Sequence, residues 1–186
     1  MRFLAVDPGS TESAYVIAEL EDDALVLEVQ AGIVDNVRLR EQLPKLSGLH
    51  RAIFEFPSTF GSQATPQVLE TCFWVGVFTQ AISVPSEKID RRTVKATLLG
   101  SARGSDAEIR QVLLRRWGGD RDAAHGTKAK PGPLYGFKAD LWAALAVAEA
   151  YAEVQAEKAE TEIKSRRRRG HDRVIPTLKT AALLGG

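Results

Sequence analysis

Three carboxylates in this sequence stand where apolar segments begin or end. Asp7 follows the apolar run 3–6 and precedes a proline and a glycine, and Glu55 follows a second apolar run in a similar way. Asp140 stands at the start of a long apolar segment. Short apolar runs bounded by turn residues are typical of buried strands. The pattern therefore predicts two acids at strand ends and a third acid one turn into a helix.

Acids placed in this way could hold divalent cations. Carboxylates gathered in a medium of low dielectric repel one another unless a cation neutralises them. Oxygen ligands suit Mg²⁺ or Mn²⁺, and two such ions about 4 Å apart would activate water and stabilise the leaving oxygen of a phosphodiester. The alternative is that each acid caps a turn or lies at the surface, since Asp-Pro-Gly is a common turn.

The elements around these acids predict an α/β domain. Residues 3–6, 13–20 and 24–34 are expected to form three strands of an antiparallel meander, with an acidic turn at 21–23. If the strand before Glu55 lies parallel to the first strand, Asp7 and Glu55 emerge at the same edge of the sheet. A short strand is also expected at 83–85.

Apolar periodicity and capping residues predict the helices. Residues 64–82 are expected to form a mostly buried helix on the sheet, and residues 106–117 a helix capped by Ser105. The other predicted helices are 35–46, ending near Pro44, then 91–99, and 138–151, which continues through 153–163 to the basic run 166–169. Residues 118–136 are expected to form a long loop.

The charge distribution favours a polyanionic partner. Residues 1–70 carry a net charge of −6 and residues 71–186 one of +7. One cysteine and no long apolar run predict a cytoplasmic protein without a membrane role. Residues 1–157 are expected to form one domain, and residues 158–186 a charged helical extension with a basic tail.

Four segments carry a resemblance to a known family: Leu-Ala-Val-Asp-Pro-Gly-Ser at 4–10, Ala-Ile-Phe-Glu at 52–55, Val-Lys-Ala-Thr-Leu-Leu-Gly-Ser-Ala at 94–102 and Asp-Leu-Trp-Ala-Ala-Leu-Ala at 140–146. In this order the chain resembles the RuvC family of Holliday junction resolvases, from residue 1 to about residue 151. The resemblance implies an RNase H-like α/β fold with a five-stranded mixed sheet flanked by helices. It also implies a homodimer that cleaves two strands of like polarity at a four-way junction of DNA, with Mg²⁺ (or Mn²⁺) at two sites. Asp7, Glu55 and Asp140 take the positions of the family's catalytic metal ligands.

The chain departs from the family at three positions, which is typical of a divergent member, such as a viral one. Ala143 stands where the family usually has a second helix acid, and Ala14 where it has a glycine. Ser58 stands where an aromatic residue wedges into the junction. Phe60 is the preferred substitute for that wedge, with a core position as the alternative.

DNA contacts are predicted at basic residues near the acids, where they would bind phosphates rather than read bases. Lys95 and Arg103 are preferred because the family's lysine helix and glycine loop contact DNA. Arg110 and Lys128 are further candidates. The alternative for each residue is an ordinary solvated charge, and the basic run 166–169 could bind DNA, bind a partner or only add solubility.

Several functions remain open at this point. The leading hypothesis is a metal-dependent, structure-selective DNA endonuclease that resolves junctions, in the nucleoid or in an infected host cell. The same fold could act on flaps or RNA–DNA hybrids, and Ala143 is also compatible with a DNA-binding protein that does not cleave. An actin-like kinase shares the opening strand-acid-glycine pattern, but it needs two lobes and a much longer chain.

Overall fold

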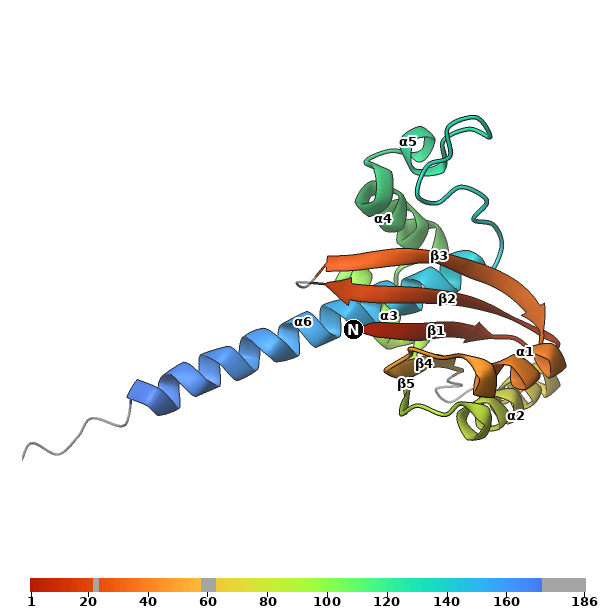
Figure 1. The fold of residues 1–186 in the computed structure, drawn as a ribbon, viewed down its shortest axis with the longest axis horizontal. Coiled ribbons are helices and arrows are strands. Elements are labelled where there is room, and N and C mark those ends of the chain that lie inside the picture. Colours follow the sequence, from red (N-terminus) through yellow and green to blue (C-terminus); the bar gives the residue numbers. More distant parts are fainter. Residues whose placement is uncertain (22–23, 58–62, 172–186) are drawn as a thin grey trace, which may run out of the picture. The chain divides into compact units, whose positions relative to one another are not determined.

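The structure is a computed structural model that describes residues 1–21, 24–57 and 63–171 (Figure 1). Its strands are β1 (Arg2–Pro8), β2 (Glu12–Glu21), β3 (Ala24–Asp35), β4 (Arg51–Phe56) and β5 (Ser86–Asp90). Its helices are α1 (Asn36–Gln42), the 3-10 turn η1 (Leu43–Lys45), α2 (Pro66–Ala81), α3 (Arg91–Leu99), α4 (Asp106–Gly118), α5 (Arg121–His125) and α6 (Leu141–His171). The chain divides into two compact units, and the second begins at Gln155. The predicted boundary at 157/158 therefore falls within α6.

The strands form one mixed sheet in the order β3-β2-β1-β4-β5. β1 and β3 each pair antiparallel with β2, so the predicted meander is confirmed. β1 pairs parallel with β4, and β4 pairs parallel with β5. The five-stranded mixed sheet and the parallel arrangement of the first and fourth strands are thus confirmed.

The sheet separates two apolar layers within the first unit. Phe3 and Ala5 of β1 face a layer built with α3, α4 and the first half of α6, whereas Leu4 and Val6 face α1 and α2 (Figure 1). All four side chains are fully buried. A central strand buried on both faces reads as a continuous apolar run, and this is why the opening residues could be recognised as a strand.

Three predicted elements are wrong in position. β5 lies at Ser86–Asp90 and not at 83–85, because it is a half-buried edge strand whose charged sequence carries no apolar signal. The predicted loop 118–136 contains α5, which begins where Asp120 accepts a hydrogen bond from the backbone N–H of Ala123 at 2.8 Å. α6 begins at Leu141, not at residue 138, and continues past the basic run to His171.

α2 is less buried than its composition suggests. Among its residues only Val75 and Phe78 are fully enclosed, whereas Leu69 and Phe73 are 60% and 58% exposed. A helix that is apolar on every side does not reveal which face meets the sheet, so the prediction of a mostly buried helix is wrong. In the described part of the chain, no helix combines the length and hydropathy that a bilayer crossing needs.

Candidate active site

Two of the predicted acids leave the sheet at the same edge. Val6 of β1 is level with Phe54 of β4 in a parallel pair. The next residues are Asp7 and Glu55, so both carboxylates lie at the carboxyl ends of adjacent strands. We call these two residues the strand-end carboxylates. The parallel pairing of β1 and β4, which was expected to bring the two acids to one edge, is present.

The turn after β1 is held by three hydrogen bonds, of which the one between Ser13 and Asn36 is buried. The N–H of Gly9 donates to the carbonyl of Glu12 at 3.1 Å, and a Cβ on Gly9 would lie only 2.4 Å from that oxygen. Asn36 donates to the carbonyl of Gly9 at 3.0 Å and accepts a hydrogen bond from Ser13 at 2.6 Å. A glycine is therefore required at this position, and the turn holds Asp7 in a defined place.

Asp7 is strongly affected by its surroundings. The pKa of Asp7 is raised from 3.8 to about 7, mainly by burial and next by the negative charge of Glu55. Arg91 lowers this pKa, and Asp140 and Asp106 add smaller increases. A buried carboxylate with this pKa lacks enough positive charge nearby. A cation at this edge would relieve that deficit.

Glu55 has a direct cationic partner. Burial raises the pKa of Glu55, and the charge and hydrogen bond of Arg91 oppose this shift. Arg91 Nη1 donates to Glu55 Oε2 at 3.1 Å, and Arg91 Nη2 donates to Asp106 Oδ1 at 2.7 Å. Lys95 Nζ lies 3.3 Å from the same oxygen of Asp106. Four charged groups thus form a chain from the sheet edge to α4.

The strand-end carboxylates fit a divalent cation that draws most of its ligands from elsewhere. Within the residues that the structure describes, no three acidic, histidine or cysteine side chains are close enough to form a metal site. Mg²⁺ is commonly held by one or two carboxylates, with water and phosphate oxygens filling its other positions. The chemistry of Asp7 and Glu55 suits such an ion, as does the unbalanced charge at Asp7.

Asp140 is placed differently from the prediction. It precedes α6 instead of lying one turn inside the helix, and its backbone carbonyl accepts hydrogen bonds from Ala143 and Ala144 at 3.0 Å. The preceding residue, Ala139, has a φ of 43°, which interrupts the helix. The side chain of Asp140 is exposed, although its charge still raises the pKa of Asp7. Asp140 is therefore near the strand-end carboxylates without forming a cluster with them.

The two preferred DNA-binding candidates differ in their surroundings. Lys95 lies on α3 and forms an ion pair with Asp106. Arg103 is exposed in the segment between α3 and α4. Lys95 thus belongs to the chain of charged groups that begins at Glu55, whereas Arg103 follows α3 in the sequence.

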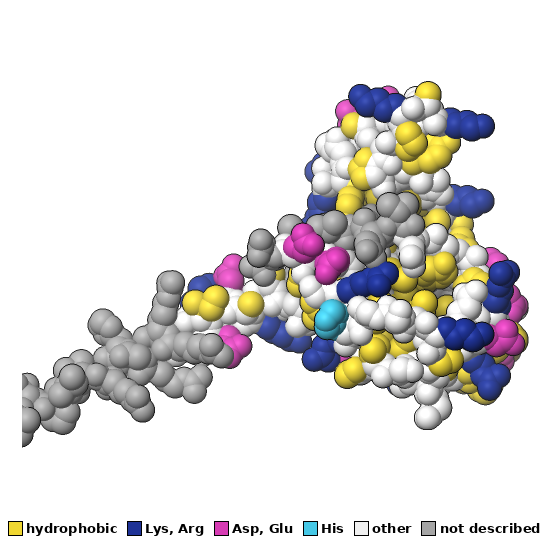
Figure 2. Space-filling view, in the orientation of Figure 1, with side chains coloured by type: hydrophobic (Ala, Val, Ile, Leu, Met, Phe, Trp, Pro, Cys, Tyr) yellow, Lys and Arg dark blue, Asp and Glu magenta, His cyan; other side chains and the backbone are white. Residues whose placement is uncertain are grey.

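The remaining candidates lie farther along the chain. The guanidinium of Arg110 lies 4.6 Å from the ring centre of Trp142, in the first turn of α6. It also lines a pocket of about 580 Å³ with residues of α5 and the following loop. Lys128 is exposed in that loop, and Figure 2 shows Lys and Arg side chains projecting from this part of the surface. Phe60 lies outside the described residues.

Arg91 was expected among the basic residues beside the site, but its contacts with Glu55 and Asp106 were not predicted. Asp106 follows Ser105, whose side chain accepts a hydrogen bond from the N–H of Glu108 in a capping box. This pattern indicates the start of a helix and nothing more. The contact with Arg91 depends on how α3 and α4 pack, and no local signal could have revealed it.

A five-stranded mixed sheet in the order β3-β2-β1-β4-β5, flanked by helices, is an RNase H-like fold. The sequence matches no known family profile and no characterised protein at the sequence level. The fold is similar to the structure of RuvC from Thermus thermophilus, with a TM-score of 0.64, 17% identity, and coverage of 85% of this chain and 97% of that one.

Two further resolvase structures share the fold. The fowlpox virus resolvase, solved with its substrate Holliday junction DNA, has a TM-score of 0.52 and 14% identity and covers 83% of this chain and 99% of that one. The yeast mitochondrial Holliday junction resolvase Ydc2 has a TM-score of 0.51 and 12% identity, and the match covers 89% of this chain and 85% of that one. The chain thus has the fold of RuvC-type Holliday junction resolvases.

Proposed function

We propose that this protein is a metal-dependent, structure-selective endonuclease that hydrolyses phosphodiester bonds in Holliday junctions or other branched DNA. The observation that carries this proposal is the pair of strand-end carboxylates, half-buried at one edge of a resolvase-type sheet. Burial and mutual repulsion leave Asp7 with a raised pKa, as expected for an acid that receives a cation.

Different residues of the chain would bind the cation and the DNA phosphates. Asp7 and Glu55 would hold the cation, with Asp140 reaching it from the start of α6. A bound Mg²⁺ or Mn²⁺ would activate a water molecule and stabilise the leaving oxygen of the phosphodiester. Lys95 and Arg103 would hold phosphates of the DNA arms, with Arg110 and Lys128 extending the contact.

The experiment is a nicking assay on a mobile four-way junction with Mg²⁺, Mn²⁺ or EDTA. We expect Asp7→Asn to reduce nicking at least roughly a thousandfold, because the cation loses a ligand, while junction affinity stays within about threefold. Glu12→Gln is the matched control, since it neutralises an exposed acid on the same turn. Cleavage by Asp7→Asn at the wild-type rate would contradict the assignment of Asp7 to the active site.

The same assay decides between branched substrates. Junctions, flaps and RNA–DNA hybrids are compared at one salt concentration, because phosphate contacts weaken as salt rises. We expect the four-way junction to be cleaved fastest. Faster cleavage of flaps or hybrids would support the proposed nuclease activity but would change the proposed substrate.

A junction-binding protein that does not cleave is the second candidate. It is favoured by the exposed Asp140 and by Ala143, which puts no acid one turn farther along α6. This candidate predicts binding without products under any divalent ion, and gain of nicking by Ala143→Asp. Divalent-dependent nicking by the wild-type chain would exclude it.

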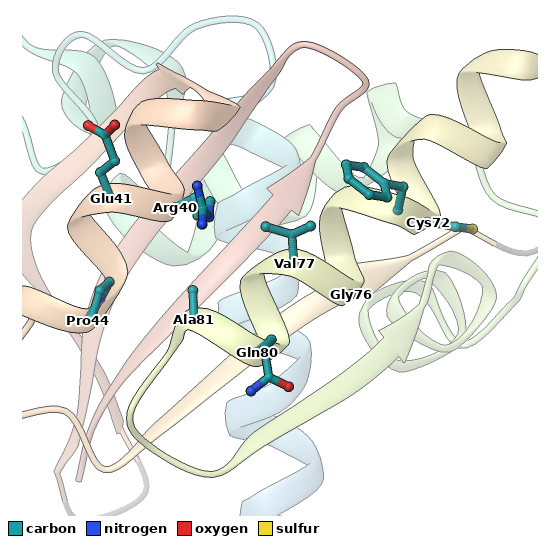
Figure 3. Close-up of a pocket in the computed structure, with 9 residues that line it drawn as sticks. Arg40, Glu41, Pro44, Cys72, Gly76, Val77, Gln80 and Ala81 are labelled. Atoms are coloured by element: carbon teal, nitrogen blue, oxygen red, sulfur yellow. The ribbon is translucent and has the colours of Figure 1, made fainter.

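We propose in addition that the protein acts as a homodimer, since symmetric cutting of two strands requires two sites. A groove of about 900 Å³ runs between α1 and α2, with Val77 and Ala81 on one side and Arg40 and Pro44 on the other (Figure 3). The exposed Phe73 also lines this groove. An exposed apolar surface of this kind is typical of an interface, and a second copy of α2 is the proposed occupant.

Sedimentation velocity tests the dimer. We expect the wild-type chain to sediment as a dimer and Phe73→Glu to weaken the association at least roughly thirtyfold, because a charge would be buried in the interface. Tyr135→Glu, which changes an exposed aromatic residue of the loop after α5, is the control. A wild-type monomer at every concentration would overturn the proposal.

A further inference from the structure

The guanidinium of Arg91 is shared between the candidate metal site and α4. Its Nη1 donates to Glu55 at 3.1 Å and its Nη2 to Asp106 at 2.7 Å. The planar fork of an arginine can serve two carboxylates at once, whereas a lysine ammonium is a point charge. The two contacts are therefore made together, by separate nitrogens of one rigid group.

The two carboxylates that hold Arg91 differ in exposure. The side chain of Glu55 is 12% exposed, that of Arg91 25% and that of Asp106 71%. Asp106 is also paired with Lys95 at 3.3 Å. Glu55 thus receives its positive charge from Arg91 inside the protein, while Asp106 is a second anchor for Arg91 near the solvent.

A divalent cation held by Glu55 would use the carboxylate that Arg91 already contacts. The hydrogen bond from Arg91 occupies Oε2 of Glu55, and its positive charge repels a second cation nearby. A cation that binds Oε2 from the side where Arg91 Nη1 lies would displace the Arg91–Glu55 hydrogen bond. Asp106 lets Arg91 keep one carboxylate partner after the bond breaks, so the exchange does not leave a buried guanidinium without a partner.

From this arrangement we propose that Arg91 is a positioning residue that competes with the divalent cation for Glu55 and turns toward a DNA phosphate once the cation is bound. The first half of this inference concerns the free protein, and the second half rests on the proposed function. The nitrogen released from Glu55 is a strong donor for a phosphate oxygen. Cation binding and phosphate binding would then support each other.

The first test measures Mn²⁺ binding to the free protein by electron paramagnetic resonance of unbound Mn²⁺, with no DNA and no catalysis. Arg91→Gln should bind Mn²⁺ about tenfold more tightly, because the competing charge is gone. Asp106→Asn should bind it about threefold more weakly, because Arg91 then depends on Glu55 alone. In the Arg91→Gln background, Asp106→Asn should change the affinity by twofold or less.

The controls separate charge from shape and from folding. Arg92→Gln removes the same charge from the same helical turn, where that charge acts on Asp90, and should change Mn²⁺ affinity by less than twofold. Arg91→Lys keeps the charge without the fork and should stay within about threefold of the wild type. Circular dichroism and thermal unfolding confirm that each variant is folded. Glu55→Gln should abolish the effect of Arg91→Gln.

The second test repeats the Mn²⁺ titration with a junction whose phosphodiesters resist cleavage. The wild type should gain at least threefold in Mn²⁺ affinity, and Arg91→Gln should gain less than half as much. Unchanged or weaker Mn²⁺ binding by Arg91→Gln in the first test would overturn the competition, even in an active nuclease. Absence of junction binding with the first pattern intact would overturn the phosphate step and the proposed function, but not the competition.

Discussion

Acids that are buried or half-buried occur in two regions of this molecule, and their partners differ. Glu149, on α6, accepts hydrogen bonds from the indole of Trp117 at 2.6 Å and from Arg116 at 2.9 Å. It lies in the first unit and is nearly enclosed. At the sheet edge, Arg91 bonds to Glu55 but acts on Asp7 through its charge, and the pKa of Asp7 still rises to about 7.

The difference separates an acid that stabilises a fold from one that can receive a ligand. Both oxygens of Glu149 accept hydrogen bonds from neighbours that tie α6 to α4, and one of these neighbours, Arg116, is a cation. The strand-end carboxylates hold more negative charge than their neighbours balance. Uncompensated charge in a rigid frame is a signature of a functional site, and each prediction below tests this contrast.

The largest effect is expected in the pH dependence of stability without divalent ions. Asp7 has a pKa of about 7 in the native state and about 3.8 when unfolded, so the native state holds an extra proton between these values. The free energy of unfolding therefore falls as pH rises through this window. Asp7→Asn should be more stable than the wild type, with an advantage that grows by roughly 2–3 kcal/mol from pH 5 to pH 8.

Urea unfolding in EDTA at the two pH values measures this advantage. Glu12→Gln should show no such growth, since that acid is exposed. Parallel pH curves for the wild type and Asp7→Asn would mean that the charge of Asp7 is already compensated, and the contrast with Glu149 would fail.

A smaller effect with the opposite sign is expected at Glu149. Glu149→Gln should lower the free energy of unfolding at pH 7 by roughly 1–3 kcal/mol, because Arg116 loses one of its two charged partners. Glu160→Gln, which breaks an exposed pair with Lys164, should change it by less than about 0.5 kcal/mol. Junction nicking by Glu149→Gln below half of the wild-type rate would contradict a purely stabilising role.

The smallest effects are expected for the basic side chains that are proposed to bind DNA phosphates. Arg103 is exposed, whereas Lys95 is already paired with Asp106 at 3.3 Å. Arg103→Ala should therefore weaken junction binding by roughly three- to tenfold at low salt and reduce the salt dependence by about one phosphate contact. Lys95→Ala should do less. Fluorescence anisotropy over a salt series measures both, and a larger loss for Lys95→Ala would reverse the expected order.

The parts of the fold that were predictable depend on local patterns. β1 and β4 were recognisable because buried strands read as unbroken apolar runs, and the helix at 106–117 because Ser105 caps it. β5 and α5 were not, since an edge strand may be charged and a five-residue helix has too little periodicity to detect. The exposed face of α2 could not be predicted because its composition is apolar on every side.

The candidate site was predictable to the same degree. Asp7 and Glu55 could be recognised as candidates because each directly follows an apolar run. The parallel pairing of their strands brings the two acids to one edge. The exposure of Asp140 depends on the backbone at Ala139, whose left-handed conformation no local pattern announces.

Local chemistry along the chain was thus enough to propose which acids could bind a cation, because strand ends and turns are encoded by neighbouring residues. The packing of distant elements decided the rest. Arg91 meets Glu55 and Asp106 because α3 lies between the sheet edge and α4, and Glu149 gains its two donors because α4 packs on α6. Charge compensation depends on distances in space, which neighbours in sequence do not specify.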